Sequence, residues 1–261
     1  MTQDVMNDLV PKKLKKIEDE YDIKILLAVE SGSRAWGFAS PDSDFDVRFI
    51  YKRPRNKYLE LNPNRDVIEL PINDTWDING WDLNKTLILL YKSNPTLFEW
   101  FGSPIRYYKT DFCDEIKPLL TNYFSVKNTL HHYLSTAKHD YKQFLQSETV
   151  NPKKYFYALR PILACNWILE HETPPPVLFD TLCKETLPIP LKSTIDYLLD
   201  IKINNPEKTT INAIPYLNGY LKDNFFKFDD ILKNMPNGYE HTWSLGWEPL
   251  NEFFIKNLET F

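Results

Sequence analysis

The chain has 261 residues, of which 43% are hydrophobic and 15% aromatic, enough apolar material for one large domain or two modest ones. Its formal net charge of −5 argues against a protein that grips long duplex DNA, but it permits a nucleotide or an RNA end as substrate, because a metal ion can supply positive charge locally. The polar N-terminus is unlike a signal peptide and no apolar run in the sequence approaches about 18 residues, so we expect a cytoplasmic protein without a membrane partner.

One helical pattern and then several strand patterns occupy the first part of the chain. Residues 2–20 have the spacing of an amphipathic helix. Four later stretches have the composition of strands: residues 23–30 (IKILLAVE), 45–52 (FDVRFIYK), 65–72 (RDVIELPI) and 75–81 (TWDINGW). The first is apolar almost throughout, which is typical of a strand covered on both faces. The second alternates, with Phe45 and Val47 on one face and Asp46 on the other, and an Asn73-Asp74 turn joins the last two strands.

Helical patterns dominate from residue 83 onward. The clearest are residues 125–146 and 151–172, the second with a kink expected at Pro161. The predicted layout is therefore α/β first and helical second, with a boundary near residue 110.

The stretch SGSRAWGFASPDSDFDVRFIY (residues 31–51) brings carboxylates to the start of an apolar strand. Asp44 and Asp46 lie two residues apart, so in a strand they share a face, with Cα atoms about 6–7 Å apart. Like charges this close repel one another and favour a bound cation, and Mg²⁺ prefers carboxylate oxygens together with substrate phosphates. The alternative is a solvated Ser-Pro-Asp-Ser turn that leads into an edge strand.

Gly32 and Ser33 favour the metal interpretation. They follow the first apolar strand and lead into a short helix, whose backbone N–H groups suit the phosphates of a nucleoside triphosphate. Gly32 permits close approach of a phosphate to the backbone, and Arg34 offers a charge-assisted contact. Two interpretations of Arg48 stay open, an ion pair with an aspartate and a contact with a phosphate oxygen.

An apolar strand, Gly-Ser, a gap of about ten residues and Asp-x-Asp together resemble the signature of the DNA polymerase β-type nucleotidyltransferase superfamily. The run through DINGWDLNKTLILLYKSNPTLFEWFGSPIRY and the later KKYFYALRPILACNWI resemble its RNA-repair-pathway branch, over residues 23–172. The resemblance implies a polymerase β-like fold, with a mixed-sheet catalytic domain in residues 1–110 and an all-α domain in residues 111–261. It also implies transfer of a nucleoside monophosphate from a nucleoside triphosphate, with Mg²⁺ or Mn²⁺ as cofactor and pyrophosphate as product.

The superfamily further implies a third carboxylate on a neighbouring strand, which completes the metal site and accepts a proton from the acceptor hydroxyl. Asp77 lies inside a predicted strand, where a carboxylate needs an explanation, and we favour it. Asp82 precedes a predicted helix and equally suits an N-cap, and Glu69 is a third candidate. A bulge at Gly80 would change the phase of this strand. The predicted metal ligands are Asp44, Asp46 and Asp77, and Asp82 is a further catalytic candidate.

Lys153, Tyr157 and Arg160 share one face of the predicted 151–172 helix. This face is either solvated or, as the superfamily implies for a helical domain that closes over its nucleotide, a contact for the triphosphate or base. We include all three among the predicted nucleotide-binding residues.

The acceptor of the transferred group is not encoded in any motif of the sequence. The family resemblance points to an RNA 3′ end, while a small molecule or a protein hydroxyl stays open. The basic run KRPRNK (residues 52–57) is either a track for RNA phosphates or an exposed loop. The alternative function is a non-catalytic nucleotide or RNA sensor on the same fold, although a pure binder gains little from two adjacent aspartates.

Overall fold

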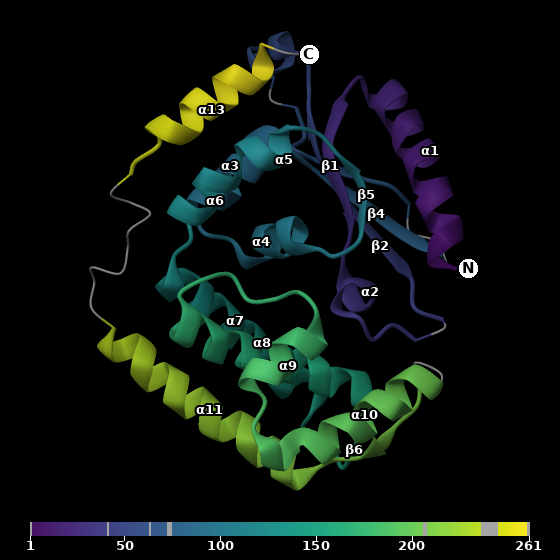
Figure 1. Cartoon of the computed structure of the whole chain (residues 1–261), viewed down its shortest axis with the longest axis vertical. Coiled ribbons are helices and arrows are strands. Elements are labelled where there is room, and N and C mark those ends of the chain that lie inside the picture. Colours follow the sequence, from purple (N-terminus) through teal and green to yellow (C-terminus); the bar gives the residue numbers. More distant parts are fainter. Residues whose placement is uncertain are drawn as a thin grey trace. The chain divides into compact units, whose positions relative to one another are not determined.

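The computed structural model describes residues 2–40, 42–62, 64–71, 75–205, 208–235 and 245–259 (Figure 1). The chain forms two compact units. The first, called the sheet unit, comprises Met1–Ala35, Asp44–Tyr123 and His241–Phe261, and the second, called the helical unit, comprises Trp36–Ser43 and Phe124–Glu240. No helix in the described part of the chain is long and apolar enough to cross a membrane.

The sheet unit is built on a five-stranded sheet with the order β3-β4-β2-β1-β5. Its strands are β1 (Lys24–Glu30), β2 (Phe45–Lys52), β3 (Val67–Glu69), β4 (Trp76–Asp82) and β5 (Arg106–Lys109). β2 and β4 are parallel and all other neighbours are antiparallel, so the predicted mixed sheet is confirmed. β3 is shorter than predicted, β5 has no counterpart among the predicted elements, and the Asn73-Asp74 turn lies outside the described residues.

Alternation in β2 separates an apolar face of the sheet from a polar one. The apolar face packs against helix α1 (Gln3–Tyr21), and burying each large apolar side chain there contributes about 1.5–3 kcal/mol. Because a shift by one residue would turn every β2 side chain over, this core forces Asp46 and Arg48 to the opposite face. The core between α1 and β2 contains Met6, Val10, Leu14, Ile17, Phe45, Val47, Phe49 and Tyr51.

Two short helices follow β4 in the chain, α3 (Leu83–Tyr91) and α4 (Pro95–Gly102). Trp100 of α4 stacks on Trp81 of β4, with 3.8 Å between ring centroids. Trp81 shares a strand face with Asp77, since the two residues are four apart. The face that carries the aspartates is therefore covered by aromatic packing at the far end of β4.

The helical unit contains α7 (Val126–Phe144), α8 (Pro152–His171), α9 (Phe179–Thr186), α10 (Lys192–Asn204) and α11 (Pro215–Asn234). α7 and α8 are the two helices that the sequence predicts most clearly, and they share one buried core. α8 continues through Pro161, so the proline does not end the helix. A short antiparallel ribbon of β6 (Thr149–Val150) and β7 (Ile211–Asn212) interrupts the otherwise helical region.

The two compact units differ from the predicted division at residue 110. Three helices from beyond that residue belong to the sheet unit: α5 (Phe112–Glu115), α6 (Lys117–Asn122) and α13 (Glu248–Leu258). Phe112 packs against Phe253, with 5.7 Å between ring centroids, and the Tyr123 hydroxyl donates a hydrogen bond to Gly246 O at 2.9 Å. Local sequence patterns do not predict that the C-terminal segment belongs to the sheet unit.

Gly80 of β4 lies in register with Phe49 of β2, and a Cβ atom at Gly80 would overlap the Phe49 ring. We expect Gly80→Ala to lower the free energy of unfolding by about 1–3 kcal/mol, because the ring would have to move within a packed core. Gly219→Ala is the matched control, since Gly219 lies in α11 with open space at its Cβ position, and it should raise stability by up to about 1 kcal/mol. Urea unfolding measures both changes, and a Gly80→Ala protein as stable as the wild type would contradict this packing.

Candidate functional site

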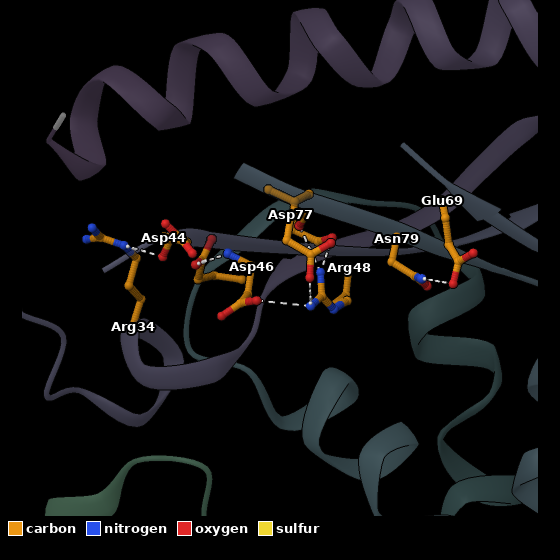
Figure 2. Close-up of polar contacts among 9 residues, drawn as sticks. Arg34, Asp44, Asp46, Arg48, Glu69, Asp77 and Asn79 are labelled. Carbon is orange, nitrogen blue, oxygen red and sulfur yellow. Dashed lines mark hydrogen bonds and ion pairs between the residues drawn. The ribbon is translucent and has the colours of Figure 1, made fainter. Parts of the chain in front are cut away.

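Asp46 of β2 and Asp77 of β4 are direct neighbours in the sheet. The register pairs them, and it runs without a shift along the whole of both strands, so no bulge occurs at Gly80. Residues in register on parallel strands turn their side chains to the same face, which is here the face away from α1 (Figure 2). Their side chains are 30% and 32% exposed, so both carboxylates are accessible to a ligand from solvent.

Arg48 holds these two carboxylates together. Its Nη2 lies 2.9 Å from Asp46 Oδ1 and 2.7 Å from Asp77 Oδ2 (Figure 2). Its Nη1 donates to two backbone carbonyls, Asp77 O at 2.8 Å and Val47 O at 3.2 Å. Of the two interpretations of Arg48, the structure therefore contains the ion pair, with one nitrogen serving both aspartates.

Gly32 packs directly against the other oxygen of Asp46. A Cβ atom at position 32 would overlap Asp46 Oδ2, and Gly32 has φ of +59°, a conformation that other residues adopt only with strain. The neighbouring Ser31 N–H donates to Asp46 O at 2.9 Å. Gly32 opens the short helix α2 (Gly32–Trp36), in which Ser33 is half-buried. The predicted phosphate turn and Asp46 are thus in direct contact.

Glu30, at the end of β1, is a buried acid that the sequence pattern did not single out. It is fully buried, and it accepts hydrogen bonds from the Asp46 N–H at 2.8 Å and from the Tyr107 hydroxyl at 2.5 Å. Burial raises the pKa of Glu30 to about 7, against the lowering effect of these hydrogen bonds. The sequence signal that could have indicated Glu30 is its position as the last residue of an apolar strand, directly before Ser-Gly-Ser.

Negative charge accumulates around Asp46. Burial raises the pKa of Asp46 above its ordinary value, the nearby carboxylates of Asp77 and Asp44 raise it further, and Arg48 opposes the shift. Asp44 itself precedes the first residue of β2 and is exposed. Arg34 donates from Nε to Asp44 O at 3.0 Å, and its guanidinium lies over a neighbouring aromatic ring, so it supports the backbone before β2.

Asp82 and Glu69, the other two candidates for the third carboxylate, lie elsewhere. Asp82 is five residues beyond Asp77 on a regular strand, hence on the opposite face and roughly 16 Å along it. It caps α3 by accepting from Asn84 N at 2.8 Å, and burial raises its pKa to about 6. Glu69 is exposed on the edge strand β3 and is engaged by Arg65 and by Asn79. Geometry favours Asp77 as the partner of Asp46.

The predicted nucleotide-binding residues of the helical unit lie on α8. Lys153 is half-buried in its first turn, and Tyr157 packs edge-on against Trp36 with 6.0 Å between ring centroids. Arg160 is only 2% exposed, and its guanidinium lies 4.7 Å from the centre of the Trp36 ring. Arg160 is therefore buried against Trp36, whereas Lys153 and Tyr157 are only half-buried.

The basic run of residues 52–57 is largely used inside the fold. Lys52 is buried and donates to Asn257 O at 2.7 Å, and the Arg53 Nε lies 3.5 Å from an oxygen of Asp82. Of the remaining two basic residues, Lys57 pairs with Glu60 at 2.8 Å and Arg55 is exposed. A continuous track for RNA phosphates does not result.

The carboxylates fit a divalent cation in their chemistry, since Asp46 and Asp77 offer oxygen ligands on one face and Asp44 adds charge nearby. In the described ranges, however, no three or more His, Cys, Asp or Glu side chains are grouped so as to hold a metal ion. Two of the carboxylates, those of Asp46 and Asp77, are paired with the Arg48 guanidinium instead.

Glu30 predicts a specific pH dependence of stability. Its pKa is raised in the folded protein, so between about pH 4.5 and 7 the native state keeps a proton that the unfolded state releases, and stability falls as pH rises. Relative to Glu30→Gln, we expect the wild type to lose about 2–3 kcal/mol of unfolding free energy across this range. Urea unfolding in a chelating buffer from pH 4.5 to 7.5 measures the difference.

The exposed Glu20 of α1 provides the control, and Glu20→Gln should follow the wild type at every pH. A stability difference between wild type and Glu30→Gln that stays constant with pH would show that Glu30 does not titrate in this range.

The chain is similar to known proteins. The model of the family described as RlaP, RNA repair pathway DNA polymerase beta family, matches residues 6–256. Uncharacterized protein YcgL of Bacillus subtilis (strain 168) is 47% identical over 204 residues, which cover 77% of this chain and 78% of that protein. A solved nucleotidyltransferase-like protein from Exiguobacterium sibiricum 255-15 is 12% identical, with a TM-score of 0.32, over 84% of this chain and 73% of that one. The family match spans nearly the whole chain, which confirms the resemblance read from the sequence: the protein belongs to the RNA repair pathway DNA polymerase beta family, and this membership supports a nucleotidyltransferase role.

Proposed function

We propose that the protein transfers a nucleoside monophosphate from a nucleoside triphosphate to an acceptor hydroxyl and releases pyrophosphate. The observation that carries the proposal is the contact of the Asp46 carboxylate with Gly32, in register with Asp77. It unites two groups that this reaction needs, a backbone turn suited to phosphates and a pair of carboxylates suited to Mg²⁺ or Mn²⁺.

Each part of the site has a role in the proposed reaction. The Gly32 N–H and the Ser33 hydroxyl bind the β- and γ-phosphates at the start of α2. Asp44, Asp46 and Asp77 hold Mg²⁺ or Mn²⁺, which when bound supplies positive charge to the phosphate oxygens. Asp77 accepts the proton of the acceptor hydroxyl while the hydroxyl oxygen forms a bond to the α-phosphorus. The bond between the α-phosphorus and the oxygen that bridges to the β-phosphorus breaks, and pyrophosphate leaves.

The acceptor that we propose is an RNA 3′ end. Family membership supports it, whereas the internal use of Lys52 and Arg53 and the net charge of −5 favour a short contact with RNA over a long one. Arg34 positions Asp44 in this scheme, and nucleotide contacts by Lys153, Tyr157 and Arg160 stay a prediction. A protein or small-molecule hydroxyl is the alternative acceptor.

One observation favours a second candidate, a non-catalytic nucleotide or RNA sensor. Arg48 already neutralises part of the charge of Asp46 and Asp77, as it would in a site that never holds a metal ion. The two candidates differ in a simple respect, because a sensor binds nucleoside triphosphates without turning them over.

Label transfer from α-labelled nucleoside triphosphates tests the proposal. The protein is incubated with Mn²⁺ or Mg²⁺ and total RNA, or with cell extract, and both labelled product and pyrophosphate are measured. We expect Asp46→Asn and Asp77→Asn each to lower transfer by about a thousandfold or more, because the carboxylates act on charge that develops in the transition state.

Asp82→Asn is the matched control, because Asp82 caps α3 on the opposite face. Asparagine caps a helix about as well as aspartate does, so this variant should keep the α3 cap and leave transfer nearly unchanged. Transfer that survives both Asp46→Asn and Asp77→Asn would overturn the mechanism, loss confined to Asp82→Asn would reassign the third carboxylate, and nucleotide binding without turnover would favour the sensor.

A further inference from the structure

Arg48 is placed as a cation would be in this site. A single nitrogen, Nη2, lies within 2.9 Å of Asp46 Oδ1 and within 2.7 Å of Asp77 Oδ2. The side chain is only 17% exposed, so solvent screens these ion pairs less than it would on an open surface. Guanidinium and divalent cation therefore compete for the same two oxygens.

The second nitrogen shows how firmly this arrangement is held. Nη1 donates to Asp77 O and to Val47 O, so the guanidinium plane is anchored to the backbone of both parallel strands. Asp46 Oδ2 faces Gly32 instead, on the side of the carboxylate away from Arg48. Oδ1 of Asp46 is thus paired with Arg48, while Oδ2 faces the Gly32 turn, at which a phosphate would bind.

The charges of the site permit a metal ion to replace Arg48 at the carboxylates. One guanidinium offsets only part of the charge of Asp46, Asp77 and the nearby Asp44. A bound triphosphate would add negative charge beside Gly32 and would offer oxygens to which a guanidinium binds well.

We propose that Arg48 is the resident counter-cation of this site, that it keeps the affinity for a free divalent cation low, and that it moves to a phosphate oxygen when a metal–triphosphate complex enters. The inference rests on the proposed function, since it assumes that Asp46 and Asp77 hold a metal ion. It gives Arg48 two opposite effects, competing with the metal alone and binding the metal–nucleotide complex.

The test compares Arg48→Gln with wild type in two titrations. In the first, Mn²⁺ binding without nucleotide is followed through the paramagnetic resonance signal of the free ion. In the second, binding of the Mn²⁺ complex of a non-hydrolysable α,β-methylene triphosphate is measured at equilibrium. We expect Arg48→Gln to bind Mn²⁺ alone about tenfold more tightly and the Mn²⁺–nucleotide complex about tenfold more weakly. A merely damaged site would lose affinity in both titrations.

Matched variants make each outcome decisive. Arg55→Gln removes an exposed arginine of the same unit and should behave as wild type in the titration of Mn²⁺ alone. Arg48→Lys keeps the charge on a side chain that cannot bridge both carboxylates and reach the backbone, so it too should bind Mn²⁺ alone more tightly than wild type, which preserves the test if Arg48→Gln does not fold.

Asp46→Asn separates this inference from the proposed function. If Asp46→Asn no longer binds Mn²⁺ while neither Arg48 variant binds Mn²⁺ alone more tightly than wild type, the proposed role of Arg48 is overturned. The proposed metal site at Asp46 and Asp77 is then still supported. If neither wild type nor the Arg48 variants bind Mn²⁺, or Asp46→Asn binds it as wild type does, both proposals fail.

Discussion

The contact between the Asp46 carboxylate and the backbone of Gly32 is the constraint on which the rest of the site depends. It exists only because residue 32 has no Cβ and a positive φ, so the turn after β1 can close on the start of β2. Glu30 reinforces it by accepting from the Asp46 N–H, and Arg48 holds the remaining carboxylate oxygen. Each polar group of Asp46 therefore has a defined neighbour before any ligand binds.

The apolar face of the sheet determines where these polar groups lie. Phe45 and Val47 are buried under α1, so the intervening Asp46 has to face the other way, and the parallel pairing of β2 with β4 brings Asp77 beside it. Repulsion between the two carboxylates would oppose this pairing in the absence of a cation. Arg48 supplies a positive charge from the same strand and pairs with both carboxylates, so it offsets part of this repulsion.

Local patterns predicted the face of Asp46, the glycine turn and most strands, because alternation and turn chemistry act over a few residues. The register of Asp46 with Asp77 depends on pairing between strands about thirty positions apart, which alternation does not encode. The same limit applies to α13, which belongs to the sheet unit although it follows the helical unit in the sequence. Local patterns do not indicate a role for Glu30, because a charged residue at a strand end ordinarily faces solvent. Here Glu30 is buried and accepts hydrogen bonds from Tyr107 and Asp46.

The central claim is that Asp46 and Asp77 jointly bind a divalent cation next to the Gly32 turn. Anomalous diffraction from a crystal soaked with Mn²⁺ and a non-hydrolysable triphosphate tests it most directly. A manganese peak in bonding contact with oxygens of both aspartates, with the triphosphate on the Gly32 and Ser33 backbone and Arg48 withdrawn from the carboxylates, is the result expected. A peak elsewhere, or a triphosphate bound while Arg48 still bridges Asp46 and Asp77, would contradict the claim.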